Sequence, residues 1–145
     1  MSKDALDLRT VVPVPPARVF SAWVDAKEHA RFTGAAATSA PRVGGRFTAW
    51  DGYIEGSYLE LDPGRRLVMT WRTSEFPADH GDSCLELRLT AIDGGTEIHL
   101  VHTGLPEGQG VRYESGWSEF YFQPLARYFA TPAAKKPAAK KPRAR

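Results

Sequence analysis

The sequence has few features that would place the protein outside a reducing compartment or within a membrane. It contains a single cysteine, Cys84, which excludes an intramolecular disulfide and a thiolate cluster and fits a cytoplasmic location. No stretch approaches the ~18 apolar residues of a membrane span, and the start lacks the basic and apolar regions of a secretory signal. Phosphate-cradling loops, nucleophile elbows and Ser/His/Asp patterns are also missing, so we predict no catalytic residues and no cofactor.

Acidic residues are absent from residues 131–145, which carry six Lys and Arg side chains in a Pro-Ala-Ala-Lys-Lys repeat. Removing these six from the 19 basic residues leaves 13 against 17 acidic ones, a formal charge of −4 for residues 1–130. We therefore expect a single domain over 1–130 and a disordered basic tail over 131–145. The tail is read as a solvated extension, with weak nonspecific contact to nucleic acid or an acidic partner as the alternative.

Turn-forming residues divide the rest of the chain into short runs rich in strand formers. Asp51-Gly52, Asp62-Pro63-Gly64 and Asp93-Gly94-Gly95 are typical of tight turns, which join antiparallel neighbours. These turns predict a five-stranded meander, preceded by an earlier strand and a weaker one. The meander strands are expected at residues 46–50, 53–61, 66–73, 83–91 and 96–103, and the earlier two at 8–14 and 36–40.

Alternation of apolar and polar residues indicates that one face of this sheet is buried, with Leu67, Met69 and Trp71 on the same side. Two short helices are expected after the first strand, the second one capped by Asp25 and Glu28. A broad apolar stripe over 110–130 predicts a long terminal helix, in which a proline at position 124 should cause a kink. The predicted class is α+β: a curved antiparallel sheet of six to seven strands wrapped around the C-terminal helix.

The order of these motifs resembles the activator of heat-shock-protein-90 ATPase homologue-like family, within the START-like (SRPBCC, Bet v 1-type) helix-grip superfamily. The resemblance covers about residues 6–130. It implies a helix-grip fold with a cavity between helix and sheet, where members of the wider superfamily bind lipids, hormones and polyketides and some act as cyclases. It also implies a possible chaperone partner and a role in the stress response. The residues that carry it are 16–25, 44–47, 56–67, 69–71, 94–102 and 116–117.

The side chains expected to line this cavity come from the buried sheet face and the terminal helix. His102 follows Ile98 and Leu100 at two-residue spacing, so all three side chains are expected on the buried face of the same strand. His102 then either orients a ligand or is a hydrogen-bonded core histidine. The aromatic residues could wall a ligand site or simply fill the core. Metal-capable side chains in the 79–82 loop lack a ligand spacing, and we predict no metal site. The predicted cavity residues are Met69, Trp71, Leu87, His102, Trp117, Phe120 and Tyr121.

From the sequence we therefore expect a cytoplasmic protein that binds a hydrophobic small molecule between the terminal helix and the sheet. The alternative is a protein-interaction role as a chaperone-associated or stress-response accessory. A polyketide-cyclase-like enzyme is the third interpretation, and it would need an acid/base pair in the cavity that the sequence does not supply.

Overall fold

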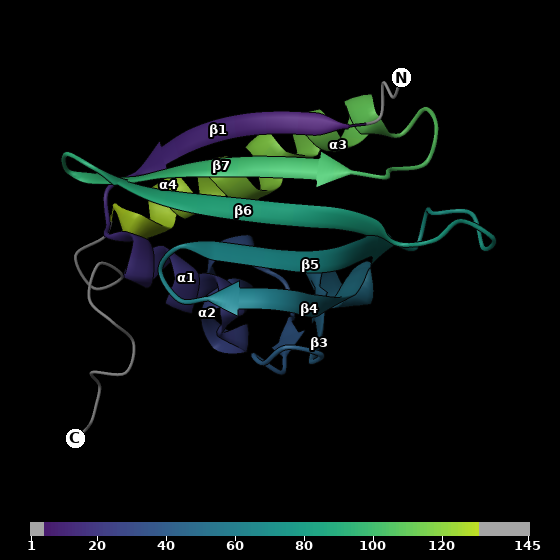
Figure 1. The fold of residues 1–145 in the computed structure, drawn as a ribbon, viewed down its shortest axis with the longest axis horizontal. Coiled ribbons are helices and arrows are strands. Elements are labelled where there is room, and N and C mark those ends of the chain that lie inside the picture. The colour runs from purple at the N-terminus through teal and green to yellow at the C-terminus, as the bar shows by residue number, and fades with distance from the viewer. Residues whose placement is uncertain (1–4, 131–145) are drawn as a thin grey trace.

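The computed structural model describes residues 5–130. The tail expected to be disordered, residues 131–145, lies outside these residues. Seven strands form one antiparallel sheet in the order β1-β7-β6-β5-β4-β3-β2, which confirms the predicted meander (Figure 1). The first strand lies at the edge of the sheet, paired with β7. The strands are β1 Leu6–Val12, β2 Thr38–Ser39, β3 Arg46–Ala49, β4 Ile54–Asp62, β5 Arg66–Thr73, β6 Ser83–Ile92 and β7 Gly95–Thr103.

Tight turns hold the central hairpins in register. Gly64 joins β4 to β5 with φ 77°, and Gly94 joins β6 to β7 with φ 82°, conformations that glycine adopts without a Cβ penalty. Between β5 and β6, Leu67 pairs with Leu87 and Met69 with Leu85, so the large apolar side chains of both strands share one face. All four are almost fully buried, which confirms the period-2 pattern.

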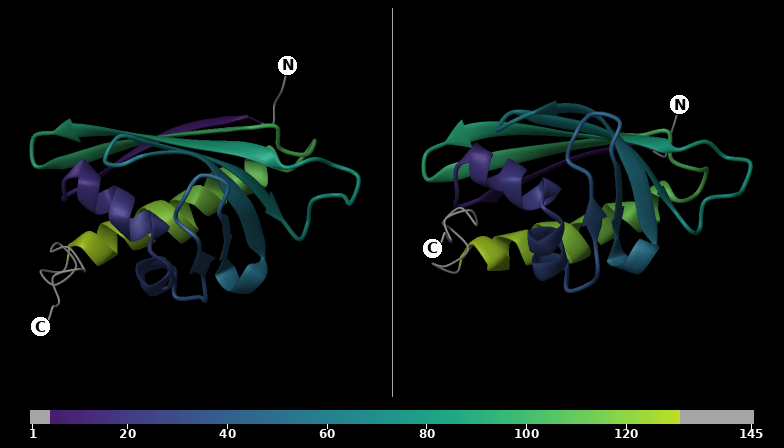
Figure 2. Two further views of the ribbon diagram at one scale, coloured as in Figure 1. Left: turned by 60° about the horizontal axis from the view of Figure 1, so that its bottom comes forward. Right: turned by 90° about the horizontal axis from the view of Figure 1, so that it is seen from below.

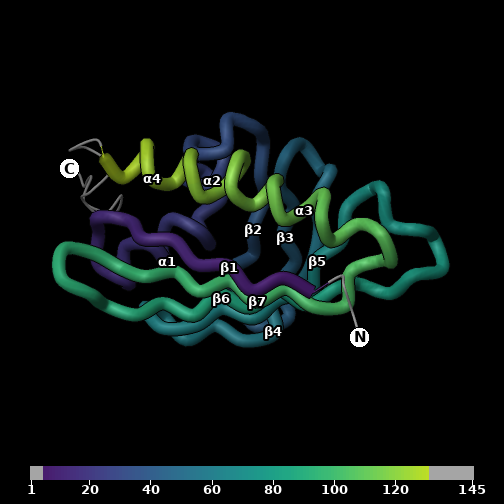
Figure 3. Tube along the Cα trace, turned by 90° about the horizontal axis from the view of Figure 1, so that it is seen from above, coloured from purple at the N-terminus to yellow at the C-terminus, as the bar shows by residue number. Residues whose placement is uncertain are grey.

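Within the part of the chain that the structure describes, helices cover only the concave face of the sheet. Two short helices, α1 Pro16–Val24 and α2 Ala26–Thr33, follow β1, and the terminal helix runs beneath the sheet along its length (Figure 2). In the view of Figure 3, α2 lies beside the terminal helix, on the same side of the sheet. The helix-grip arrangement expected from the sequence is therefore present. No helix in the described part of the chain is long and apolar enough to cross a membrane.

The terminal helix consists of three consecutive segments: α3 Gly110–Trp117, a π-helical turn η2 Ser118–Phe122, and α4 Gln123–Phe129. Pro124 is the second residue after the π-helical turn. Because proline has no N–H, the carbonyl one turn earlier loses its helical partner, and a wider turn accommodates that loss. The chain continues through Pro124 as one long helix (Figure 2). The local disturbance expected there takes the form of this π-helical turn.

A buried ion pair ties α1, α2 and α4 together. Asp25 caps α2 as predicted, because its carboxylate accepts a hydrogen bond from the Glu28 backbone N–H at 3.0 Å. The Glu28 carboxylate does not complete the capping box. It instead accepts two hydrogen bonds from the guanidinium of Arg18, at 2.7 and 3.1 Å, and a third from the Tyr128 hydroxyl at 2.7 Å. Arg18 also lies over the ring of Phe129.

Candidate functional site

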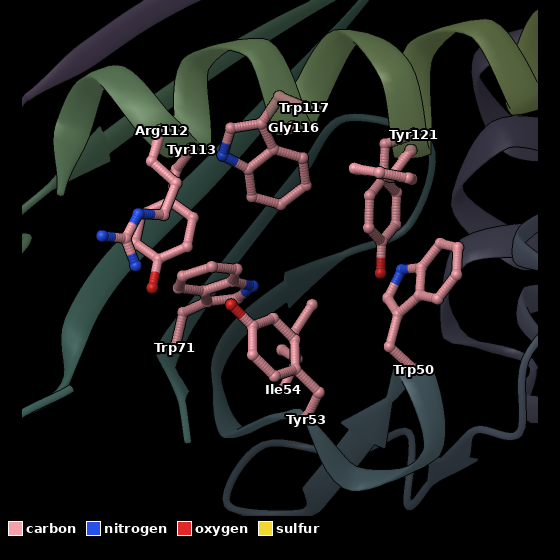
Figure 4. A pocket seen from close by; sticks show the side chains of 10 residues that line it. Trp50, Tyr53, Ile54, Trp71, Arg112, Tyr113, Gly116, Trp117 and Tyr121 are labelled. Carbon is pink, nitrogen blue, oxygen red and sulfur yellow. The ribbon is translucent and has the colours of Figure 1, made fainter. Parts of the chain in front are cut away.

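A pocket of about 340 Å³ opens between the first half of the terminal helix and the β3–β5 end of the sheet. Its lining is almost entirely apolar and aromatic (Figure 4). This volume falls in the range of small-molecule sites, which are concave and mostly apolar with a few placed polar groups. The pocket is lined by Trp50, Tyr53, Ile54, Trp71, Arg112, Tyr113, Gly116, Trp117, Phe120 and Tyr121.

The sheet side and the helix side of the pocket meet at a cluster of stacked rings. Trp71 on β5 and Trp117 on α3 have ring centroids 5.6 Å apart, so they contact each other directly. They form one continuous wall, which Tyr113 extends from Trp71 at 5.2 Å and Tyr121 extends from Trp117 at 4.9 Å.

Trp50 lies in a strained turn and forms the side of the pocket opposite the Trp71–Trp117 wall. The sequence predicts a strand through position 50, but β3 ends at Ala49, and residues Trp50–Gly52 form a 3-10 turn, η1. Trp50 and Asp51 adopt φ of 54° and 60°, values uncommon for residues other than glycine. Asp51 stabilises the turn by hydrogen bonds with the backbone of Ala36, at 2.9 Å through its carboxylate and 3.0 Å through its N–H. The turn directs the Trp50 indole N–H at the Tyr121 hydroxyl (Figure 4).

His102 lies behind the Trp71–Trp117 wall and holds it in place. Its Nδ1 accepts a hydrogen bond from the Trp117 indole N–H at 3.2 Å, and its Nε2 donates to the Ser83 hydroxyl at 2.8 Å. Ser83 in turn donates to the Trp71 carbonyl at 2.7 Å. This directional chain requires a neutral imidazole, and burial lowers the pKa of His102 to about 3.

His29 on α2 supports the other end of the pocket in the same way. Its Nδ1–H donates to the Trp23 carbonyl at 2.9 Å, and its Nε2 accepts from the Tyr121 hydroxyl at 2.7 Å. Burial lowers the pKa of His29 to about 4, against the opposing effect of the hydrogen bond to Trp23. Burial also raises the pKa of Tyr121, so both partners stay neutral. Two neutral histidines therefore fix the pocket walls from behind.

The charged groups near the pocket compensate each other at its mouth. Arg112 forms an ion pair with Glu75, and the Glu75 carboxylate also accepts a hydrogen bond from Tyr53 at 3.0 Å. Burial, together with the Glu75 carboxylate, raises the pKa of Tyr53 to about 12. Beside this group, the Tyr113 hydroxyl contacts Thr73 and Gln109, each at 2.7 Å. The mouth is polar, but its cation is already neutralised.

Four of the seven predicted cavity residues border the pocket: Trp71, Trp117, Phe120 and Tyr121. The other three, Met69, Leu87 and His102, are buried in the core and lie outside the lining. Contact of any of these residues with a ligand stays a prediction.

Six lining residues were not predicted. Two of them, Tyr113 and Gly116, lie on the helix face of Trp117 and Phe120, and that three-to-four spacing was a usable signal. Arg112 precedes Tyr113 on the same helix. The remaining three flank or belong to the turn after β3, where no local pattern points to a cavity: Trp50, Tyr53 and Ile54.

A long helix gripped by a curved antiparallel sheet, with an aromatic pocket between them, defines a protein of the START-like (SRPBCC) helix-grip class. Within this class, the chain belongs to the "Activator of Hsp90 ATPase homolog 1-like protein" family, whose profile matches residues 13–130. It is 34% identical over 100 residues to the human activator of 90 kDa heat shock protein ATPase homolog 1, and 28% identical over 117 residues to the activator homolog of Dictyostelium discoideum. These matches cover 68% and 77% of this chain but only 29% of each relative, so the chain spans less than a third of their length.

Solved structures support the same fold. An Hsp90 activator from Plasmodium falciparum superimposes with a TM-score of 0.80 at 23% identity, over 88% of this chain and 97% of that one. CalU16 from Micromonospora echinospora superimposes with a TM-score of 0.74 at 28% identity, over 90% of this chain and 78% of that one. The proteins that this chain resembles thus include several named as activators of Hsp90 or of its ATPase.

Proposed function

We propose that the protein binds a hydrophobic small molecule in the pocket between the terminal helix and the sheet. The observation that carries this proposal is an aromatic cavity of about 340 Å³ whose walls are fixed from behind by His29 and His102. Side chains that served only as core would be expected to close around one another, since protein interiors pack at crystal-like density. Both histidines are held neutral behind the rings, an arrangement that suits reversible binding better than proton transfer near neutral pH.

The expected affinity is modest. A bicyclic aromatic molecule that buries about 200 Å² of apolar surface gains about 5 kcal/mol at 25 cal/mol per Å². Preorganised walls reduce the entropic cost of binding. We therefore expect dissociation constants of about 0.1–1 mM for simple apolar probes.

The direct test is native mass spectrometry of the full chain purified from its own host. A retained small molecule should appear as a discrete mass increment that collisional activation removes. The matched variant Gly116→Leu fills the pocket from the helix and should lack that increment. A wild-type protein without any increment, which also fails to bind apolar aromatic probes, would refute the proposal.

A second candidate function is that of an Hsp90-associated accessory protein, and it is supported by the family and by the activator relatives. The test is the ATPase rate of Hsp90 from the same host, measured while this chain is added from zero to a saturating concentration. Stimulation that persists in Gly116→Leu would assign the chaperone effect to a surface away from the pocket. No change in rate at saturating protein would contradict this function. Either activity fits the cytoplasm, which the single free cysteine favours.

A further inference from the structure

The indole N–H of Trp71 is the unusual polar group of this pocket. Trp71 is only 4% exposed, yet within residues 5–130 no acceptor receives a hydrogen bond from its Nε1. The same part of the chain holds no fully occluded side-chain nitrogen or oxygen without a partner, so this N–H must border the free volume of the pocket. Figure 4 shows the nitrogen directed away from Tyr113 and toward the centre of the cavity.

The other pocket tryptophans differ from Trp71 in this respect. Trp117 donates its indole N–H to His102, and Trp50 directs its own at the Tyr121 hydroxyl. An indole nitrogen can only donate, so Trp71 needs an acceptor to be satisfied. Leaving a buried donor unpaired costs about 1–3 kcal/mol.

The charge balance of the mouth limits the kind of acceptor. Arg112 is the one lining residue with a formal charge, and Glu75 already pairs with it. An anionic ligand would have to enter an apolar space without an uncompensated cation to receive it, which is costly. A neutral carbonyl oxygen supplies the acceptor without this penalty.

We propose that the ligand is a neutral aromatic ketone or related carbonyl compound whose oxygen accepts a hydrogen bond from Trp71 Nε1. This inference rests on the proposed function and narrows its ligand class. The aromatic walls hold the hydrocarbon part of such a molecule, and Trp71 fixes its orientation.

The test compares two matched probes, 1-indanone and indane, which differ in the carbonyl group. Both are titrated into the full-length ¹⁵N-labelled protein, and the indole N–H signals of its four tryptophans are followed. We expect 1-indanone alone to move the Trp71 indole signal downfield, while the Trp117 signal, already bonded to His102, stays nearly still. Indane should shift neighbouring backbone signals without this downfield change.

Affinities of the two probes in wild type and Trp71→Phe complete a thermodynamic cycle. The variant keeps an aromatic wall and removes the donor, so the ratio of 1-indanone to indane affinity should fall by at least fivefold. If both probes bind in the pocket but the ratio is unchanged and the Trp71 signal does not respond, the inference is wrong and the proposed function stands. If neither probe perturbs the pocket, both are wrong. Should Trp71→Phe fail to fold, the indole signals of the wild type decide the question.

Discussion

Filling the pocket from the helix is the sharpest test of whether its volume is functional. Gly116 lies on the pocket side of α3 without a side chain. A Cβ built there would meet its nearest neighbour, Cδ2 of Phe120, at 3.8 Å, which is ordinary van der Waals contact. The isobutyl group of Gly116→Leu can therefore extend into the cavity without displacing backbone.

The effect on stability should be opposite to that of most core substitutions. Replacing a helical glycine by a good helix former gains about 0.5–1 kcal/mol. Each methylene that leaves water for the aromatic pocket adds up to about 0.8 kcal/mol. We expect Gly116→Leu to raise the free energy of unfolding by about 1–2 kcal/mol, or roughly 3–8 °C in melting temperature.

The assay combines thermal unfolding with an indane titration followed by backbone amide shifts. Gly116→Leu should weaken indane binding at least tenfold. Gly116→Ala is the matched control: it gains the same helix propensity, adds only a methyl group, and should bind within about threefold of wild type. Unchanged indane affinity in Gly116→Leu would show that the cavity is not the binding space, and a melting temperature several degrees lower would show that the leucine side chain does not fit it.

Three further predictions concern the groups that hold the fold around the pocket. His29 and His102 are neutral when folded, with pKa about 4 and about 3, but protonate near pH 6.5 when unfolded. The free energy of unfolding, measured with urea, should therefore be highest above pH 6.5 and fall by roughly 1.4 kcal/mol per pH unit for each histidine as the pH falls from 6.5 toward 4. His102→Asn should halve this slope, and a flat profile would contradict the neutral state of the two histidines. Arg18→Met leaves the Glu28 carboxylate buried without its cation and should cost about 3–5 kcal/mol in urea unfolding, whereas Arg18→Met/Glu28→Leu should recover most of that loss. Tyr128→Phe removes a hydrogen bond to the same carboxylate, so we expect a loss of about 1.5 kcal/mol in the same measurement, and no loss would mean that this bond contributes nothing.

The fold could be predicted because its determinants are local. Alternating apolar residues identify the buried face of β5 and β6, and glycines with positive φ end the strands where the sequence places turns. A short turn permits only an antiparallel neighbour, so the strand order follows almost directly from the order of the runs. The terminal helix then has one uncovered apolar surface available, the concave face of the sheet.

Two details that were predicted wrongly, the capping box at Glu28 and the strand through Trp50, depend on contacts between residues distant in the sequence. Glu28 has the spacing of a capping box, but its carboxylate bonds to Arg18 on the preceding helix and to Tyr128 at the far end of the chain. Trp50 has strong strand propensity, yet the hydrogen bonds between Asp51 and Ala36 place it in a left-handed turn. No local pattern contains these partners, so the lining contributed by the turn after β3 could not be read from the sequence.

The two histidines explain why this pocket can remain open in a closely packed protein. The alternation of residues along β7 correctly predicted that His102 lies on its inner face. Both ring nitrogens of His102 form hydrogen bonds, one with Trp117 and one with Ser83. His29 likewise uses its two nitrogens to fix Tyr121 from behind. Rings held by buried hydrogen bonds cannot rotate freely into the space in front of them. These side chains would therefore lose little further conformational entropy if a ligand entered the cavity. In this arrangement the hydrogen bonds behind the wall hold its rings in place, and the indole N–H of Trp71 in front of it is the group that we propose orients the ligand.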